Sequence, residues 1–157
     1  MTYTPGDIAV VTGTGFWDRL IQTGQGLTAS RKWKKWNHAI VIVTPGGGTV
    51  EAEAKGVVYD DMANHPDPLI LPCPAGVDRN KVVAFASSKV GAGYDFFDDV
   101  LMGLDCLALG HLKLHEHGSG WICSELAAAA LVAGGWRSPK DPAAMMPSDL
   151  AMALSPV

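Results

Sequence analysis

One stretch of the chain constrains the fold more than any other. A glycine-serine segment at 118–120 leads into an alanine- and leucine-rich run that stops at Gly134 and Gly135. Alanine and leucine are the strongest helix formers, and paired glycines just past the last apolar residue are a helix stop signal. The pattern predicts a helix with Cys123 and Glu125 in its first turn. The unpaired N–H groups and the dipole of such a helix end favour a thiolate over a thiol.

Cys123 therefore has two interpretations. A free cysteine is among the most often buried residues, and most are inert packing groups. A nucleophilic cysteine instead needs a base, usually a histidine, which need not be near in sequence. The chain offers five histidines, and the two interpretations differ in whether one of them lies beside Cys123.

Composition bounds the class of protein. The chain has 157 residues, of which 48% are apolar and 18% charged, so one globular domain over 1–157 is expected. A net charge of −4 implies no polyanionic partner, and no nucleic acid is expected to bind.

The start of the chain has neither the basic nor the apolar region of a signal peptide. No apolar run approaches the ~20 residues of a membrane span. Cys73, Cys106 and Cys123 are an odd number without metal-ligand spacing, which indicates free thiols. We therefore expect a cytoplasmic protein, or a phage-associated one released by lysis.

Hydrophobic periodicity predicts an α+β fold with a small, mainly antiparallel sheet packed against helices. Expected strands and helices alternate with loops rich in glycine, proline and aspartate. Strands are predicted at 8–11, 37–44, 49–55 (extended or bulged through 56–59) and 68–73, and helices at 16–22, 77–90, 94–104, from Cys123 onward, and up to Leu154.

His38 is the first residue of an otherwise apolar predicted strand, where a titratable side chain costs free energy unless it is paired. If 45–48 form a hairpin loop, Thr44 faces Thr49. His38, Glu51 and Glu53 then point to one side of the sheet. A carboxylate beside the imidazole fixes its tautomer and stabilises its charged form. A purely structural His–Glu pair fits the hairpin equally well.

Two other motifs have competing interpretations. His111, His115 and His117 could converge on a metal ion, but they also fit an exposed polar loop, and no metal is expected. The basic, tryptophan-bearing segment 31–36 could grip an anionic polymer. We favour a solvated loop whose tryptophans cover the edge of the core, since the acidic chain lacks a wider basic face.

The order of these residues resembles the circularly permuted branch of the NlpC/P60 papain-like superfamily, the YiiX-like cysteine hydrolases. That branch carries histidine on an early strand and cysteine on a late helix. The matching pieces are Pro5-Gly6-Asp7-Ile8, Asn37-His38-Ala39-Ile40-Val41, Val50-Glu51-Ala52 with Gly56-Val57, Gly93-Tyr94-Asp95-Phe96, Cys123-Ser124-Glu125-Leu126 and Pro147-Ser148-Asp149-Leu150.

The resemblance implies Cys123 as nucleophile, His38 as general base and Glu51 as the residue that orients His38. It implies no cofactor. The reaction would be hydrolysis or transfer of an amide or ester acyl group through a thioacyl-enzyme. The substrate would be a peptide, a peptidoglycan stem peptide or another acyl compound. Substrate contact or a supporting role is expected of Glu53, Tyr94, Asp7 and Trp121.

A different class of function also fits the chain. The protein could be a non-catalytic structural or binding module that has kept the fold, with segment 31–36 as its contact surface. Selective labelling of Cys123 at neutral pH would favour the enzyme.

Overall fold

The computed structural model describes residues 2–12, 35–53, 55–93 and 121–155. Several sequence predictions lie outside these residues: the helices at 16–22 and 94–104, most of segment 31–36, and five single residues. Those residues are Tyr94, Cys106, His111, His115 and His117, the three histidines forming one cluster.

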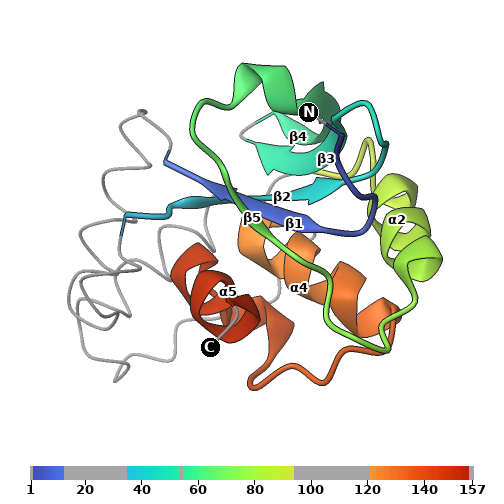
Figure 1. Cartoon of the computed structure of the whole chain (residues 1–157), viewed down its shortest axis with the longest axis vertical. Coiled ribbons are helices and arrows are strands. Elements are labelled where there is room, and N and C mark those ends of the chain that lie inside the picture. Colours follow the sequence, from blue (N-terminus) through green and yellow to red (C-terminus); the bar gives the residue numbers. More distant parts are fainter. Residues whose placement is uncertain (1, 13–34, 54, 94–120, 156–157) are drawn as a thin grey trace.

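The described residues form an α+β structure around a five-stranded antiparallel sheet in the order β4-β3-β2-β1-β5 (Figure 1). Short apolar and β-branched runs separated by turns produce these strands. The strands are β1 (Ile8–Val11), β2 (His38–Ile42), β3 (Gly48–Glu53), β4 (Gly56–Asp61) and β5 (Leu69–Leu71).

The sequence suggested that residues 56–59 extend or bulge the third strand, but this prediction is wrong. Residues 56–61 form β4, a separate strand that turns back along β3 and pairs Glu53 with Gly56. Gly56 allows this turn because its φ is +113°, and an added Cβ would lie 2.7 Å from the carbonyl oxygen of Ala92. The glycine therefore marks a turn and a close backbone approach.

The predicted register of the β2–β3 hairpin is wrong by two residues. Ile42, rather than Thr44, lies opposite Thr49. The loop is longer than expected because Thr44 bends the chain: its Oγ1 accepts the N–H of Gly48 at 2.7 Å. Since side chains alternate with a period of two, an even shift leaves every residue on its predicted face.

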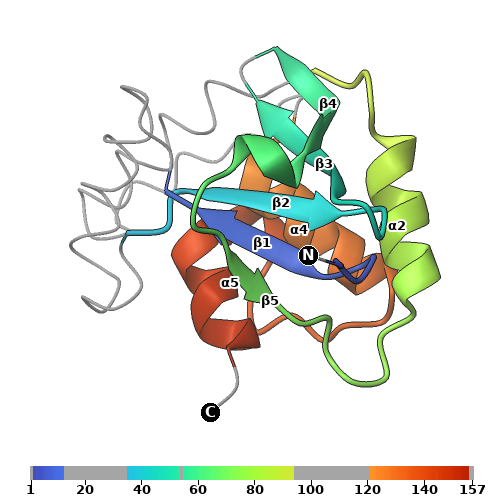
Figure 2. The same cartoon turned by 45° about the horizontal axis from the view of Figure 1, so that its top comes forward.

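One face of the sheet is covered by helix α4 (Cys123–Ala133), which lies behind the strands in Figures 1 and 2. Helix α2 (Arg79–Ser88) packs against α4, and the 3₁₀ helix η2 (Pro142–Ala144) and helix α5 (Pro147–Leu154) lie on its other flank. The main core is built from the sheet residues on this face, such as Ala39, Val41 and Val50, and from the apolar side of α4.

The opposite face of the sheet is covered by a crossing connection, residues 62–68. It must cross because β4 and β5 are the two edge strands of the sheet. It begins with the 3₁₀ helix η1 (Met62–Asn64) and passes in front of the strands in Figures 1 and 2. Met62 is buried there in a second cluster with Ile40 and Ile42.

Two further observations bear on the sequence predictions. Trp36 is buried in the main core, as the core-edge interpretation requires for this residue, and Lys35 Nζ lies 4.2 Å from its ring centroid. Among the described residues, no helix is long and apolar enough to cross a membrane.

Candidate active site

Cys123 is the first residue of α4, as predicted. The residue before it, Ile122, is extended, and the first intrahelical bond runs from the N–H of Leu126 to its carbonyl at 3.0 Å. Ser124 fixes the helix start by donating its hydroxyl to the carbonyl of Met145 at 2.6 Å. Cys123 is 4% exposed, so its thiol lies in a firmly held first turn with little contact with water.

His38 is the first residue of β2, and Glu51 lies on the neighbouring strand β3. The His38 Nε2 atom is 2.7 Å from Glu51 Oε2. The His38 side chain is 16% exposed and that of Glu51 is fully buried. A close, shielded charge-assisted hydrogen bond of this kind holds the imidazole plane in one orientation.

The side chain of Cys123 also acts on the His38 imidazole, by its charge and by hydrogen bonding. Burial alone would lower the pKa of His38. The charge of Cys123, its hydrogen bond and the same two effects from Glu51 together raise that pKa well above 6.5. Because Nε2 faces Glu51, Nδ1 is the nitrogen left to exchange a proton with the sulfur. The three side chains thus form a continuous chain of interactions from thiol to carboxylate.

Glu51 is a buried carboxylate that is well supplied with donors. Its Oε2 accepts from His38, and its Oε1 accepts from His65 Nε2 at 3.1 Å and from the hydroxyl of Thr49 at 3.3 Å. Burial would raise the pKa of Glu51, but the hydrogen bonds and charges of the two histidines lower it to about 2. Glu51 is therefore ionised at neutral pH, and both histidines donate from Nε2.

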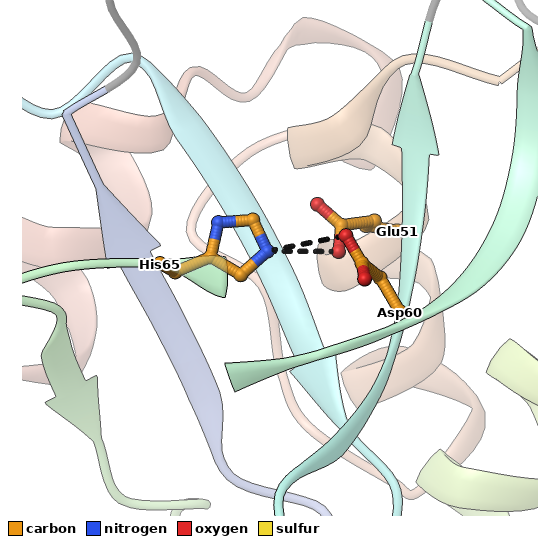
Figure 3. A group of neighbouring side chains, drawn as sticks. All are labelled: Glu51, Asp60 and His65. Atoms are coloured by element: carbon orange, nitrogen blue, oxygen red, sulfur yellow. Dashed lines mark hydrogen bonds and ion pairs between the residues drawn. The ribbon is translucent and has the colours of Figure 1, made fainter. Parts of the chain in front are cut away.

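His65 was missed by sequence reasoning, which left it between two predicted strands without a role. It lies in the crossing connection on the sheet face opposite α4, and its imidazole points at the carboxylate of Glu51 (Figure 3). The only local signal of the His65 conformation was the proline that follows it. A residue before proline favours an extended backbone, and η1 therefore ends at His65.

Glu51, Asp60 and His65 also place one ligand atom each within 4.8 Å of one another, a spacing that a metal ion can use (Figure 3). Their contacts already form a hydrogen-bonded group, however. His65 Nε2 lies 3.1 Å from Glu51 and 3.8 Å from Asp60. Asp60 in turn accepts from the side-chain amide of Asn64 at 2.6 Å. We assign these residues to hydrogen bonding.

The remaining predicted residues lie elsewhere. Glu53, on the same strand as Glu51, is 31% exposed and pairs with Lys55 at 2.8 Å. Asp7 is at the end of β1 remote from His38, where it accepts from the N–H of Cys73 at 2.9 Å and from Arg79 at 2.6 Å. These contacts hold the fold together and do not bring either side chain to Cys123.

Trp121 lies two residues before Cys123, but its ring packs toward α2. It meets Phe85 edge-on with the ring centroids 5.9 Å apart, and Lys89 Nζ lies 5.1 Å from its centroid. The backbone N–H of Trp121 donates to the carbonyl of Gly93 at 3.0 Å. Trp121 thus anchors the segment that leads into α4.

Cys73 provides a contrast to Cys123. It is buried beside Asp7 and Arg79. Burial raises the pKa of its thiol, Arg79 lowers it and Asp7 raises it, with a raised pKa as the net result. Cys73 therefore lacks the activation that a nucleophile needs.

No protein-family model matches the chain, and no curated protein matches it significantly.

Proposed function

We propose that the protein is a cysteine hydrolase or acyltransferase that cleaves an amide or ester bond through a thioacyl-enzyme. The observation that carries the proposal is the chain of contacts from Cys123 through His38 to Glu51. Three side chains from a helix start and two strands meet in the order nucleophile, base and orienting carboxylate, the arrangement that covalent acyl transfer requires.

The proposed reaction uses the charges already present in the site. His38 takes the thiol proton on Nδ1, and the Cys123 thiolate attacks the substrate carbonyl. The first N–H groups of a helix lack intrahelical partners, so the backbone N–H of Cys123 is the donor proposed for the oxyanion. His38 then protonates the leaving group, and water, activated by the same imidazole, releases the acyl group. Glu51 keeps the ring oriented throughout.

We further propose that the fold is the permuted NlpC/P60 papain-like fold. Two features support it: the histidine strand precedes the cysteine helix, and the helix packs on a small antiparallel sheet. By this resemblance, peptidoglycan stem peptides are the first substrates to test. The single-domain organisation over 1–157 and the cytoplasmic or phage-associated location belong to the same proposal.

Selective alkylation tests the proposal without a known substrate. The full chain is treated with iodoacetamide at neutral pH, and the modified cysteines are located by mass spectrometry. Cys123 should react much faster than Cys73, and His38→Ala should remove that difference. Equal, slow labelling of both would contradict the enzyme and favour the non-catalytic module.

Acyl transfer is tested with activated esters and with a panel of stem peptides. A covalent acyl adduct on Cys123, absent in Cys123→Ala and retained in Cys73→Ala, is the expected result. An adduct that persists in Cys123→Ala would show that another residue is the nucleophile.

A further inference from the structure

Glu51 links two imidazoles through the two oxygens of one carboxylate. His38 binds Oε2 and His65 binds Oε1, and the two ring centroids are 6.3 Å apart. Because the two oxygens belong to one rigid planar group, a bond that fixes Oε1 also fixes the direction of Oε2. The position of His65 is therefore coupled to that of His38.

His65 is itself held firmly. The backbone N–H of His65 donates to the carbonyl of Met62 at 3.1 Å. The backbone N–H of Met62 in turn donates to the carbonyl of Gly47 at 2.9 Å. Met62 is 2% exposed and anchors η1 on the sheet. Asp61 caps η1 by accepting the N–H of Ala63 at 2.8 Å. The imidazole thus extends from a fixed piece of backbone.

We propose that His65 is a positioning residue of the candidate active site, which holds Glu51 Oε1 so that Oε2 remains directed at His38. The inference rests on the proposed function of Cys123 and His38. A fully buried carboxylate needs donors on both oxygens. Without His65, the one hydrogen bond described for Oε1 is that of the Thr49 hydroxyl, at the longer distance of 3.3 Å. The carboxylate would then gain freedom to turn.

The electrostatic surroundings determine what loss of His65 would do. His38 is faced by Cys123 from α4 and by Glu51 from β3, and Glu51 is faced by both histidines. Asp60, from β4, lies near His65. Since burial disfavours the Glu51 anion, removing a donor raises the pKa of Glu51. A weaker carboxylate partner in turn lowers the pKa of His38, which makes the imidazole a weaker base for the Cys123 thiol.

Three single variants of the full chain test the proposal. His65→Ala removes the donor, His65→Gln keeps an N–H that can reach Glu51, and Asp60→Asn is the matched control at the other neighbour of His65. The readouts are the rate at which iodoacetamide alkylates Cys123 across pH, and the NMR titration of the His38 ring. If His65→Ala does not fold, His65→Leu removes the donor while filling the space.

His65→Ala should slow alkylation of Cys123 at neutral pH about tenfold, the effect of one charged hydrogen bond, and lower the pKa of His38. His65→Gln should restore most of both, and Asp60→Asn should change little. An unchanged His38 titration in folded His65→Ala would overturn the proposal and leave His65 a structural role.

Two other results have different meanings. A wild-type Cys123 that reacts no faster than Cys73 would refute the proposed function itself, whatever His65 does. Slowed alkylation of the wild type after EDTA treatment, with Asp60→Asn as impaired as His65→Ala, would overturn positioning by hydrogen bonds in favour of a metal ion at this cluster.

Discussion

The Nε2 atom of His38 lies 2.7 Å from Oε2 of Glu51, and this contact joins two neighbouring strands at a buried carboxylate. A charge pair shielded from water interacts more strongly than one on the surface, but it also costs more to bury. Here the cost is offset because the hydrogen bonds and charge of a second histidine, His65, support the same carboxylate. The contact therefore serves both orientation of the imidazole and ionisation of the glutamate.

Glu51→Gln should reduce acylation of Cys123 more than Glu53→Gln does, by roughly tenfold or more, about 1.4 kcal/mol in barrier. Glutamine can still orient the ring, so activity should fall without vanishing. Because the Glu51 charge raises the pKa of His38, its loss should also move the alkaline limit of the pH–rate profile to lower pH. Rate constants across pH for both variants give the comparison. A larger loss in Glu53→Gln would show that the wrong glutamate has been assigned.

Cys123→Ala should lower the pKa of His38. Burial favours the neutral ring, and the charge and hydrogen bond of Cys123 are the strongest effects that oppose it. Removing the sulfur leaves Glu51 as the opposing group, so the pKa should move toward its ordinary value of 6.5. NMR titration of the ring in both proteins measures the change. Cys73→Ala is the control and should leave the titration of His38 unaltered.

Local sequence patterns predicted most elements of the described fold. Strand 8–11 matches β1, and the helix from Cys123 matches α4 to its end. These succeed because apolar periodicity and glycine stop signals act over a few neighbouring residues. The hairpin register failed because the loop is longer than the predicted 45–48: β2 already ends at Ile42, and the Thr44 hydroxyl accepts the N–H of Gly48 within the loop. The face assignment survived the error since the shift is even.

The candidate site was predictable only in part. Alternation along the strands placed His38, Glu51 and Glu53 on one face, but it could not choose between the glutamates. Their surroundings separate them: Glu51 is buried under the crossing connection, and Glu53 lies at the β3–β4 turn beside Lys55. His65 reaches the site through a connection between opposite sheet edges, and no local pattern encodes such a crossing.

Acid should destabilise the protein between about pH 4.5 and pH 2. The pKa of Glu51 is about 2 when folded and 4.5 in its unperturbed state, so its contribution is present above pH 4.5 and is lost as the pH falls through the folded value. For this fully buried group the contribution is about 3 kcal/mol. His38, with a raised pKa, contributes fully below pH 6.5 and loses its contribution as the pH rises through its own folded value.

Urea unfolding at a series of pH values measures this dependence. The free energy of unfolding of the wild type should fall more steeply between pH 4.5 and pH 2 than that of Glu51→Gln, which has no carboxyl group to titrate there. Glu53→Gln, altered at a partly exposed surface pair, is the control and should follow the wild type. Equal acid slopes in wild type and Glu51→Gln would show that Glu51 is not held in its ionised form.

Asp7→Ala should lower stability and leave the reactivity of Cys123 unchanged. Asp7 is 7% exposed and its Oδ1 accepts from both the N–H of Cys73 and Nη1 of Arg79, joining the start of β1 to the segment after β5 and to α2. Truncation leaves a buried N–H without this acceptor and a guanidinium without this partner, a loss of about 2–3 kcal/mol. Asp7→Asn can keep the bond from Cys73 and loses chiefly the ion pair. Because Arg79 is partly exposed, that variant should lose only about 1 kcal/mol.

Urea unfolding of the two Asp7 variants gives their stabilities, and alkylation of Cys123 under folding conditions gives their reactivity. Slower alkylation of Cys123 in a fully folded Asp7→Asn would place Asp7 in the active site after all.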